Sequence, residues 1–388
     1  MNVKNLIRYM AGRIPIIKKW MISYKIAVKK KNMLTPNEVV AGETDNDAKT
    51  VILQRCKDKY SLCFSNYERE TRSILRSSEL GILLDEGEIN RICSEIMWCY
   101  FAYGFQADEF IMFDFIHKDD SERKEYISDI DRYEIYYRNN DFYDRMIFIN
   151  KYDTYRVYSK YYGRNIIYIE NERDYDAFVE FLTENEKVVV KSPALSKGDS
   201  VRLIDFNSIT DKKTEFRKLV KEGPIVVEEV IRQGKELKKL HPASVNTLRC
   251  TTVITQSEVK VFYPFIKMGQ SGSFVDNGGK GGILAGIDLN TGVICTDGID
   301  EKGHKYIEHP DSHIVIKGYQ LPRWKDCIAL VKECAGIKPA VRIVGWDVAW
   351  SDHGWIIVEG NAQGQFVGQQ GTINRGLKKE LLEMVEMR

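Results

Sequence analysis

Apolar residues recur at helical spacing through the first part of the chain. Residues 1–31 place an apolar side chain every three or four positions, which predicts a helical segment interrupted at Pro15. A second helical pattern runs from Asp45 to about Tyr103, with Gly104 as a C-terminal cap. Its first apolar stripe consists of Val51, Leu53, Cys56, Tyr60, Cys63 and Phe64. The first part of the chain is therefore predicted to be mainly helical.

Beyond residue 145 the pattern changes to short apolar runs that alternate with helical segments. A helix is predicted from Asn150 to Gly163, and another over 174–182. The runs 165–169, 187–191, 223–231 and 250–255 predict strands. Two further runs, 343–350 and 355–358, flank the turn residues 351–354 and predict a hairpin. The expected fold class is therefore α+β.

The predicted hairpin carries acidic residues where buried strands have little reason for them. Glu359 and Asn361 are two positions apart, so their side chains project from the same face of a strand. Pairing across the turn brings Asp347 towards them. Three such oxygen donors suit Mg²⁺. The alternative is that these are ordinary surface charges beside a turn.

Composition and charge limit the classes of function. The chain has 388 residues, enough for two or three domains, and a net charge of +1, which provides no general attraction to nucleic acid. Its eight cysteines form no Cys-x-x-Cys pair and are expected to be buried free thiols in a reducing cytosol. The apolar runs are too short to span a bilayer. His304, His309 and His313 are expected to be surface residues rather than a zinc site.

The N-terminal segment is an exception to this balanced charge. Residues 1–31 contain nine Lys or Arg residues and no acid. A basic amphipathic segment of this kind can lie on an anionic membrane. The alternative is that its apolar stripe packs on the next domain.

Several motifs occur in an order that matches a known family. A lysine-ended strand, 187–191, precedes the small polar loop 196–200 and the strand 223–231, which contains Glu228 and Glu229. Asp347 and the Glu359-Gly-Asn361 triplet follow. This order resembles the ATP-grasp superfamily over residues 145–370. The segments 241–249 (His-Pro-Ala-Ser-Val-Asn-Thr-Leu-Arg) and 278–282 (Gly-Gly-Lys-Gly-Gly), with Val-Gly-Trp-Asp347, narrow the resemblance to the sugar-transfer-associated ATP-grasp proteins.

The resemblance implies two α+β lobes that clasp a nucleotide, preceded by a mainly helical region. The corresponding divisions are a basic amphipathic segment (1–40), a helical domain (41–144), a small lobe (145–234) and a large lobe with the metal site (235–388). Many ATP-grasp enzymes open with a parallel α/β domain instead. The resemblance therefore implies no substrate surface in the first part of this chain.

The resemblance also implies roles for individual residues. Phosphates would contact Lys151 and Lys191, with Ser196, Lys197 and Gly198 in the loop that closes over them. Adenine would lie near Glu228 and the backbone of Glu229, Val230 and Ile231, and the ribose near Glu236. The metal ligands would be Asp347, Glu359 and Asn361. Two alternatives remain for these residues: Lys191 at the surface, and Glu228 and Glu229 at a solvated strand end.

The resemblance implies catalytic roles for Lys191 and for an arginine. Many ATP-grasp ligases carry an arginine two residues before the metal aspartate, but Gly345 occupies that position here. A guanidinium at Arg249 can hold the transferring phosphoryl group. Arg249 is preferred over Arg342, because Arg342 precedes the strand and is expected at the surface. The alternative for Arg249 is an ordinary buried ion pair. The glycine-rich segment 274–283 is interpreted as contacting an acceptor or carboxylate, or else as a hairpin tip.

The resulting functional hypothesis is an ATP-dependent ligase that joins a carboxylate to an amine or a thiol through an acyl phosphate. It would use ATP and Mg²⁺, with Mn²⁺ as a substitute, in bacterial capsule or surface polysaccharide synthesis. The protein is expected in the cytoplasm or at the inner face of the membrane. The alternatives are an ATP-grasp kinase acting on a sugar or polyol hydroxyl and a non-catalytic nucleotide-binding component of a polysaccharide assembly complex. These residues specify neither the carboxylate nor the acceptor.

Overall fold

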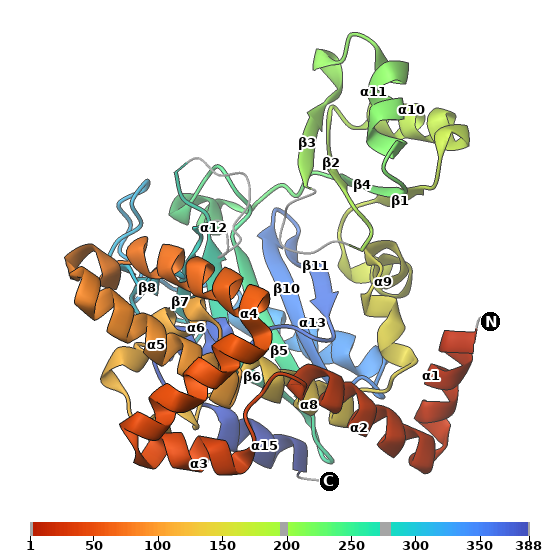
Figure 1. Cartoon of the computed structure of the whole chain (residues 1–388). Helices are drawn as coiled ribbons and strands as arrows, with labels where there is room; N and C mark the ends of the chain where they lie inside the picture. The colour runs from red at the N-terminus through yellow and green to blue at the C-terminus, as the bar shows by residue number, and fades with distance from the viewer. Residues whose placement is uncertain (1–2, 195–200, 272–280, 387–388) are drawn as a thin grey trace.

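The computed structural model describes residues 3–194, 201–271 and 281–386, and its N-terminal region is helical (Figure 1). The helices of this region are α1 (Val3–Arg13), α2 (Pro15–Lys30), α3 (Pro36–Thr44), α4 (Asn46–Arg76), α5 (Glu86–Tyr103), α6 (Ala107–Met112), α7 (Asp120–Arg123) and α8 (Asp129–Asn139). Pro15 separates α1 from α2 as predicted. Gly104 caps α5 with a φ of 85°, a left-handed conformation that glycine adopts without strain.

The first predicted stripe of α4 is wrong at two positions. Val51 is 68% exposed and Cys63 is also exposed, whereas Ile52, Cys56 and Phe64 are buried. The buried residues follow a four-residue spacing that keeps them on one helix face, and Val51 and Cys63 each lie one position away from it. The structure has all eight cysteines as free thiols, and six of them are buried.

The helices α1 and α2 are held to the protein by a small apolar cluster. Ala11 and Met21 are buried with Tyr137 of α8 and with Phe142. Part of the predicted apolar stripe therefore packs on the next helical element, as the alternative interpretation expected. Within the described ranges, no helix is long and apolar enough to cross a membrane.

A four-stranded antiparallel sheet forms a small lobe, which lies at the top of Figure 1. Its strands run in the order β1-β4-β2-β3, with β1 at Ile166–Ile169, β2 at Lys187–Lys191, β3 at Arg202–Asp205 and β4 at Ile225–Glu229. The helices α10 (Tyr175–Glu184) and α11 (Lys212–Val220) pack on it through Phe178 and Phe216. The lobe thus has its own core.

A seven-stranded antiparallel sheet forms the centre of the larger lobe, in the order β11-β10-β5-β6-β7-β8-β9. Its strands are β5 (Thr247–Ile254), β6 (Val259–Met268), β7 (Ile283–Gly286), β8 (Gly298–Ile299), β9 (Lys305–Tyr306), β10 (Ile343–Ser351) and β11 (Gly354–Asn361). The helix α9 (Lys151–Tyr158) contacts both β1 and β11, and α12 (Lys235–Leu240) follows the small lobe. The remaining helices are α13 (Trp324–Ile337), α14 (Val367–Ile373) and α15 (Lys378–Glu386).

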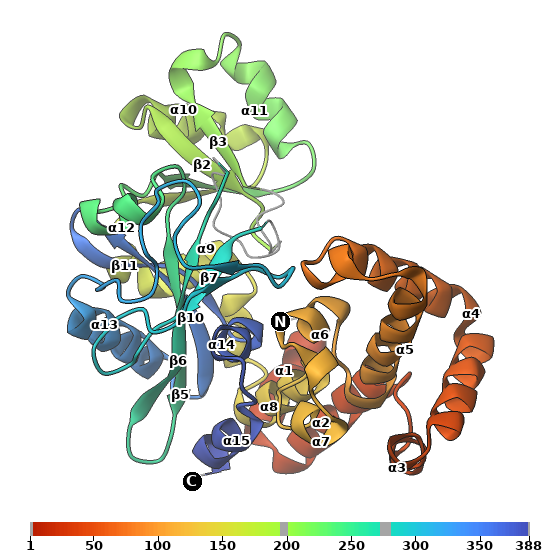
Figure 2. The same ribbon diagram turned by 90° about the vertical axis from the view of Figure 1, so that its left-hand side faces the viewer.

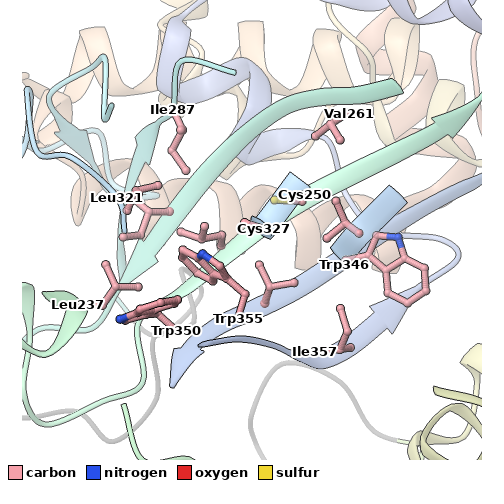
Figure 3. Close-up of a cluster of buried hydrophobic side chains, with 14 of the residues drawn as sticks. Leu237, Cys250, Val261, Ile287, Leu321, Cys327, Trp346, Trp350, Trp355 and Ile357 are labelled. Carbon is pink, nitrogen blue, oxygen red and sulfur yellow. The ribbon is translucent and has the colours of Figure 1, made fainter. Parts of the chain in front are cut away.

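The two faces of the large sheet have different roles. The helices α13 and α14 lie on opposite sides of it (Figure 2). On the α13 side, Cys250 and Cys327 meet in the main core, where Trp350 and Trp355 pack with ring centroids 5.3 Å apart (Figure 3). Because neighbouring residues of a strand alternate between faces, Arg249 points to the other side. The candidate site lies on that second face.

Candidate functional site

The hairpin β10–β11 brings together the three predicted metal ligands. Asp347 pairs directly with Glu359 across the two strands, and a bulge follows Asp347. Asn361 donates a 3.1 Å hydrogen bond from Nδ2 to Oε1 of Glu359, so both side chains lie on one face. Asp347 is only 4% exposed, and Glu359 and Asn361 are half-buried. The grouping that the sequence predicted is therefore present, and its role in binding metal stays a prediction.

Asp347 is neutralised by two cations from neighbouring strands. Arg249 donates to both carboxylate oxygens, at 2.6 and 3.0 Å, and Nζ of Lys267 lies 3.2 Å from Oδ1. Burial alone raises the pKa of this carboxyl, but Arg249 and Lys267 outweigh burial and hold the pKa below its ordinary value. Asp347 is therefore ionised.

Gly345 explains how Arg249 reaches this position. A Cβ atom on Gly345 would lie 3.2 Å from Cδ of Arg249, so the absent side chain leaves room for the neighbouring guanidinium. Arg342 instead bonds the carbonyls of Ile254 and Val385, away from the hairpin end. The geometry favours Arg249 over Arg342, and Arg249 also forms the buried ion pair of the alternative interpretation.

Lys267 is a site residue that the sequence analysis missed. It lies near the end of β6, where its backbone pairs with Thr247. Its signal is the one used for Lys191, a lysine at the end of an apolar strand, where burial of the cation requires an anion. Lys267 was overlooked because β6 itself was not predicted.

In the small lobe, Lys191 and Glu228 form a buried ion pair. Nζ of Lys191 lies 3.0 Å from Oε2 of Glu228, which is 3% exposed. Burial raises the pKa of Glu228, and Lys191 and Arg164 together outweigh burial and lower it. The ammonium of Lys191, whose side chain is 15% exposed, pairs with Glu228 instead of extending into solvent, and Glu228 is not at a solvated strand end. Both of those alternatives are therefore wrong for these side chains. Glu229 accepts bonds from the backbone and side-chain nitrogens of Asn165.

Arg164 joins the two lobes and was also missed. It donates to Oε2 of Glu228 at 2.9 Å in the small lobe, and to the carbonyls of Ile357 and Val358 at 2.8 and 3.2 Å in β11. Val358 directly precedes Glu359. Arg164 therefore couples the Lys191 pair to the strand that carries two predicted metal ligands.

Lys151 lies between these two groups of charges. It is the first residue of α9, which Asn150 caps. Burial lowers the pKa of Lys151, and nearby Glu359 partly offsets this effect. Of the two predicted phosphate lysines, Lys151 therefore interacts with Glu359 of the hairpin, and Lys191 pairs with Glu228 of β4.

The other predicted nucleotide contacts lie further along the chain. Val230 and Ile231 follow the end of β4, and Glu236 of α12 accepts a 2.6 Å hydrogen bond from Trp350 Nε1. Ser196, Lys197 and Gly198 lie outside the described residues, as does most of the glycine-rich segment 274–283.

The histidine prediction needs one correction. His309 is fully buried, where its Nε2 lies 2.7 Å from the carbonyl of Gly269, whereas His313 is exposed. The surrounding segment covers the His309 ring and excludes water. The buried ring nitrogen therefore needs this carbonyl as its hydrogen-bond partner. In the part of the chain that the structure describes, no group of three or more His, Cys, Asp or Glu side chains is arranged to hold a metal. A cation at the hairpin would therefore need the amide of Asn361, phosphate oxygens or water as further ligands.

Comparison with known proteins identifies one family. The family model described as sugar-transfer associated ATP-grasp matches residues 164–386, more than half of the chain. None of the curated proteins compared with the sequence matches it.

Several solved structures of low sequence identity align with part of this chain. The ATP-grasp ligase PsnB complexed with a minimal precursor is 12% identical, with a TM-score of 0.41, over 64% of this chain and 64% of its own. The D-alanine-D-alanine ligase from Coxiella burnetii is 12% identical, with a TM-score of 0.39, over 63% of this chain and 58% of its own. The ADP complex of N5-carboxyaminoimidazole ribonucleotide synthetase is 12% identical, with a TM-score of 0.37, over 61% of this chain and 48% of its own. This chain thus spans less than two thirds of the length of each.

Proposed function

Because the chain belongs to the sugar-transfer-associated ATP-grasp family, we propose that it is an ATP-dependent ligase that activates a carboxylate as an acyl phosphate. The observation that supports this most is a group of cations on and next to the hairpin β10–β11. Arg249 and Lys267 flank Asp347, and Lys151 interacts with Glu359. Lys191 is linked to β11 through Glu228 and Arg164. Such a concentration of positive charge suits a triphosphate.

The proposed reaction has two steps. A carboxylate oxygen of the substrate attacks the γ-phosphorus of ATP, and ADP leaves. An amine (or thiol) then attacks the acyl carbon, inorganic phosphate leaves, and the proton of the nucleophile passes to solvent. Arg249 and Lys267 would orient and neutralise the oxygens of the transferring phosphoryl group, so positioning and charge supply the rate.

The residues fit a magnesium ion on one condition. Glu359 and Asn361 are half-buried oxygen donors of the kind that Mg²⁺ (or Mn²⁺) takes. Each oxygen of Asp347 already accepts one bond from Arg249, so direct ligation by Asp347 needs a lone pair that these bonds leave free. When bound, the ion would offset charge on the phosphates. Arg249 uses Nε and Nη2 for its bonds to Asp347, so an N–H of Nη1 would be directed towards the phosphoryl group.

An isotope experiment tests the ligase proposal. A candidate carboxylate, such as a uronic acid, is labelled with heavy oxygen in its carboxyl group and incubated with the protein, ATP, Mg²⁺ and an amine. A ligase that forms an acyl phosphate transfers one heavy oxygen to the released inorganic phosphate. A kinase yields ADP and a phosphorylated acceptor, without labelled phosphate. Turnover of neither kind with any member of a sugar-acid and amino-acid panel would favour the non-catalytic alternative.

The biological setting is part of the same proposal. The family description points to sugar transfer, and we assign the reaction to bacterial capsule or surface polysaccharide synthesis, on the cytoplasmic side where ATP is available and thiols stay reduced. Mass spectrometry of the surface glycan from cells that lack this protein should show which amide-linked substituent disappears. An unchanged glycan would contradict this assignment.

A further inference from the structure

The helix α2 carries an apolar stripe that no other part of the described chain covers. Ile16, Trp20, Tyr24 and Val28 recur every four residues, so they share one helix face, and they are 76, 61, 55 and 48% exposed. The rings of Trp20 and Tyr24 stack with centroids 5.7 Å apart. Single exposed apolar residues are common on protein surfaces, but a continuous stripe of this size marks a docking surface.

The same two helices are anchored to the protein by other residues. Ala11 of α1 and Met21 of α2 are buried against Tyr137 and Phe142, and Ile17, Ile22 and Ile26 pack beside them. The exposed stripe is therefore not the face that holds α2 in place. In α1, Leu6 and Ile7 are also exposed, as is Ile14 between the two helices.

Charge indicates the kind of partner. The first 31 residues carry nine Lys or Arg residues and no acid, whereas the rest of the chain has 48 Lys and Arg against 56 Asp and Glu, a net charge of −8. Exposed cations also lie next to the stripe, at Lys19 beside Trp20 and at Lys31 beyond the end of α2. An anionic partner is therefore attracted to this end of the molecule and weakly repelled by the remainder.

We propose that α1 and α2 dock the protein on an anionic phospholipid surface, independently of the nucleotide reaction. Trp20 and Tyr24 would enter the headgroup region, where amphipathic aromatic rings are favoured, with Ile16 and Val28 beside them. The lysines would contact lipid phosphates. A second copy of the chain is a poorer partner, because a symmetric contact would bring two segments of nine positive charges together.

The position of these helices agrees with such a role. In both Figure 1 and Figure 2, α1 and α2 lie in the lower part of the molecule and the small lobe lies at the top. Docking through α2 would leave the small lobe, with Lys191 and Glu228, away from the lipid surface. The nucleotide could then enter from solution while the protein is bound to the membrane.

Vesicle co-sedimentation tests the proposal with the full-length protein. The vesicles consist either of phosphatidylcholine alone or of phosphatidylcholine mixed with phosphatidylglycerol. We expect binding to the mixed vesicles only, weakened by added salt because exposed charges are screened over about 10 Å at 0.1 M. The double substitution Trp20→Ser/Tyr24→Ser should weaken binding about tenfold or more, since each ring loses its burial. In Lys19→Glu/Lys31→Glu, losing each positive charge should weaken vesicle binding by about fivefold. The negative charge that each substitution adds should weaken it further.

A matched control distinguishes binding through this surface from nonspecific binding by exposed apolar residues. Ile82 and Leu83 are 71 and 86% exposed in the short helix η1 (Leu80–Leu83), away from the basic segment. Ile82→Ser/Leu83→Ser should bind vesicles as the unchanged protein does. Equal binding to both kinds of vesicle, equal losses in the control, or no binding would overturn the proposal. The proposal would also be overturned if sedimentation showed a dimer and the Trp20 and Tyr24 substitutions abolished it. Each variant should keep its thermal shift with Mg-ATP, so failure of this proposal and failure of the nucleotide proposal remain distinguishable.

Discussion

Arg249 and Asp347 face each other on neighbouring strands of the large sheet, joined by hydrogen bonds of 2.6 and 3.0 Å. Both side chains are largely buried, and Asp347 has Lys267 as a second cation. Removing Arg249 takes away one of the two cations that compensate Asp347, whereas removing Asp347 leaves Arg249 and Lys267 without their shared anion in a region of low dielectric constant. The pair therefore contributes to the stability of the fold as well as to the proposed chemistry.

We predict that Arg249→Gln lowers the free energy of unfolding by about 3 kcal/mol, the lower end of the range for a broken buried pair, because Lys267 still compensates part of the charge of Asp347. The double variant Arg249→Gln/Asp347→Asn should be less destabilised than the sum of the two single variants, since the pair is removed together. Chemical denaturation of the three variants measures the coupling. Additive losses would show that the two side chains do not depend on each other.

A second prediction concerns Lys191 and the nucleotide. Mg-ATP at about a hundred times its dissociation constant should stabilise the protein by roughly 2.7 kcal/mol. Lys191→Ala should remove most of this gain, because it removes the proposed phosphate contact and leaves Glu228 with one fewer cation. Lys187→Ala is the matched control: it lies on the same strand but pairs with Asp205 near the surface. Thermal denaturation with and without Mg-ATP checks both variants, and similar shifts in the two would contradict the role of Lys191.

Much of the hairpin site was predictable from the sequence, because the information is local. Alternation along a strand places Glu359 with Asn361, and the short turn sets Asp347 opposite them. The same local logic identified Asn150 as the start of α9. These relationships involve residues that are neighbours in the chain or across one tight turn.

The residues that were missed depend on contacts between distant segments. Lys267 reaches Asp347 only because β5 lies between β6 and β10 in the sheet, an order that the sequence does not reveal. Arg164 joins β4 to β11, which are separated by more than a hundred residues. His309 was expected at the surface because its segment is polar, yet the fold buries it against Gly269. Polarity of a segment predicts loop structure better than it predicts burial.

A third prediction concerns pH. His241 is buried, with its Nδ1 2.8 Å from Ser244 Oγ and its Nε2 3.4 Å from Asp311. Burial and the neighbouring His309 lower the pKa of His241, and Asp311 partly opposes them. The unfolded chain then binds a proton more readily than the folded protein. The contribution of His241 to the free energy of unfolding is fully present above about pH 6.5. It is lost as the pH falls through the lower pKa of the folded state.

The slope of stability against pH tests this assignment. Between about pH 7 and pH 5, the free energy of unfolding should fall with decreasing pH, by at most about 1.4 kcal/mol per unit from one histidine. His241→Gln should make the slope shallower, even if it also lowers stability at neutral pH. His313→Gln, at an exposed histidine, is measured alongside for comparison. An unchanged slope in His241→Gln would assign the dependence to another group.

The last prediction concerns the proposed metal ligands. Glu359→Gln hardly changes the volume of the side chain, so the fold should persist. A neutral amide is a poorer ligand for Mg²⁺ than a carboxylate, because this hard cation favours charged oxygen. The charge of the ion matters most while the phosphoryl group moves, so the loss should appear in turnover more than in ATP affinity. Asp347→Asn should lose turnover in the same way, although it also releases Arg249 and Lys267 from their shared anion.

The double variant gives the sharpest outcome. If Glu359 and Asp347 serve one metal site, Glu359→Gln/Asp347→Asn should be little slower than either single variant, because the first substitution already disables the site. Asp352→Asn is the control, since Asp352 is exposed in the turn of the same hairpin. ADP release is measured with any substrate that supports turnover, over a range of Mg²⁺ concentrations. Near-normal rates in Glu359→Gln, Asp347→Asn and the double variant would mean that Glu359 and Asp347 are only structural charges. A partial rescue of Glu359→Gln by excess Mg²⁺, absent in Asp352→Asn, would instead place the ion at this hairpin.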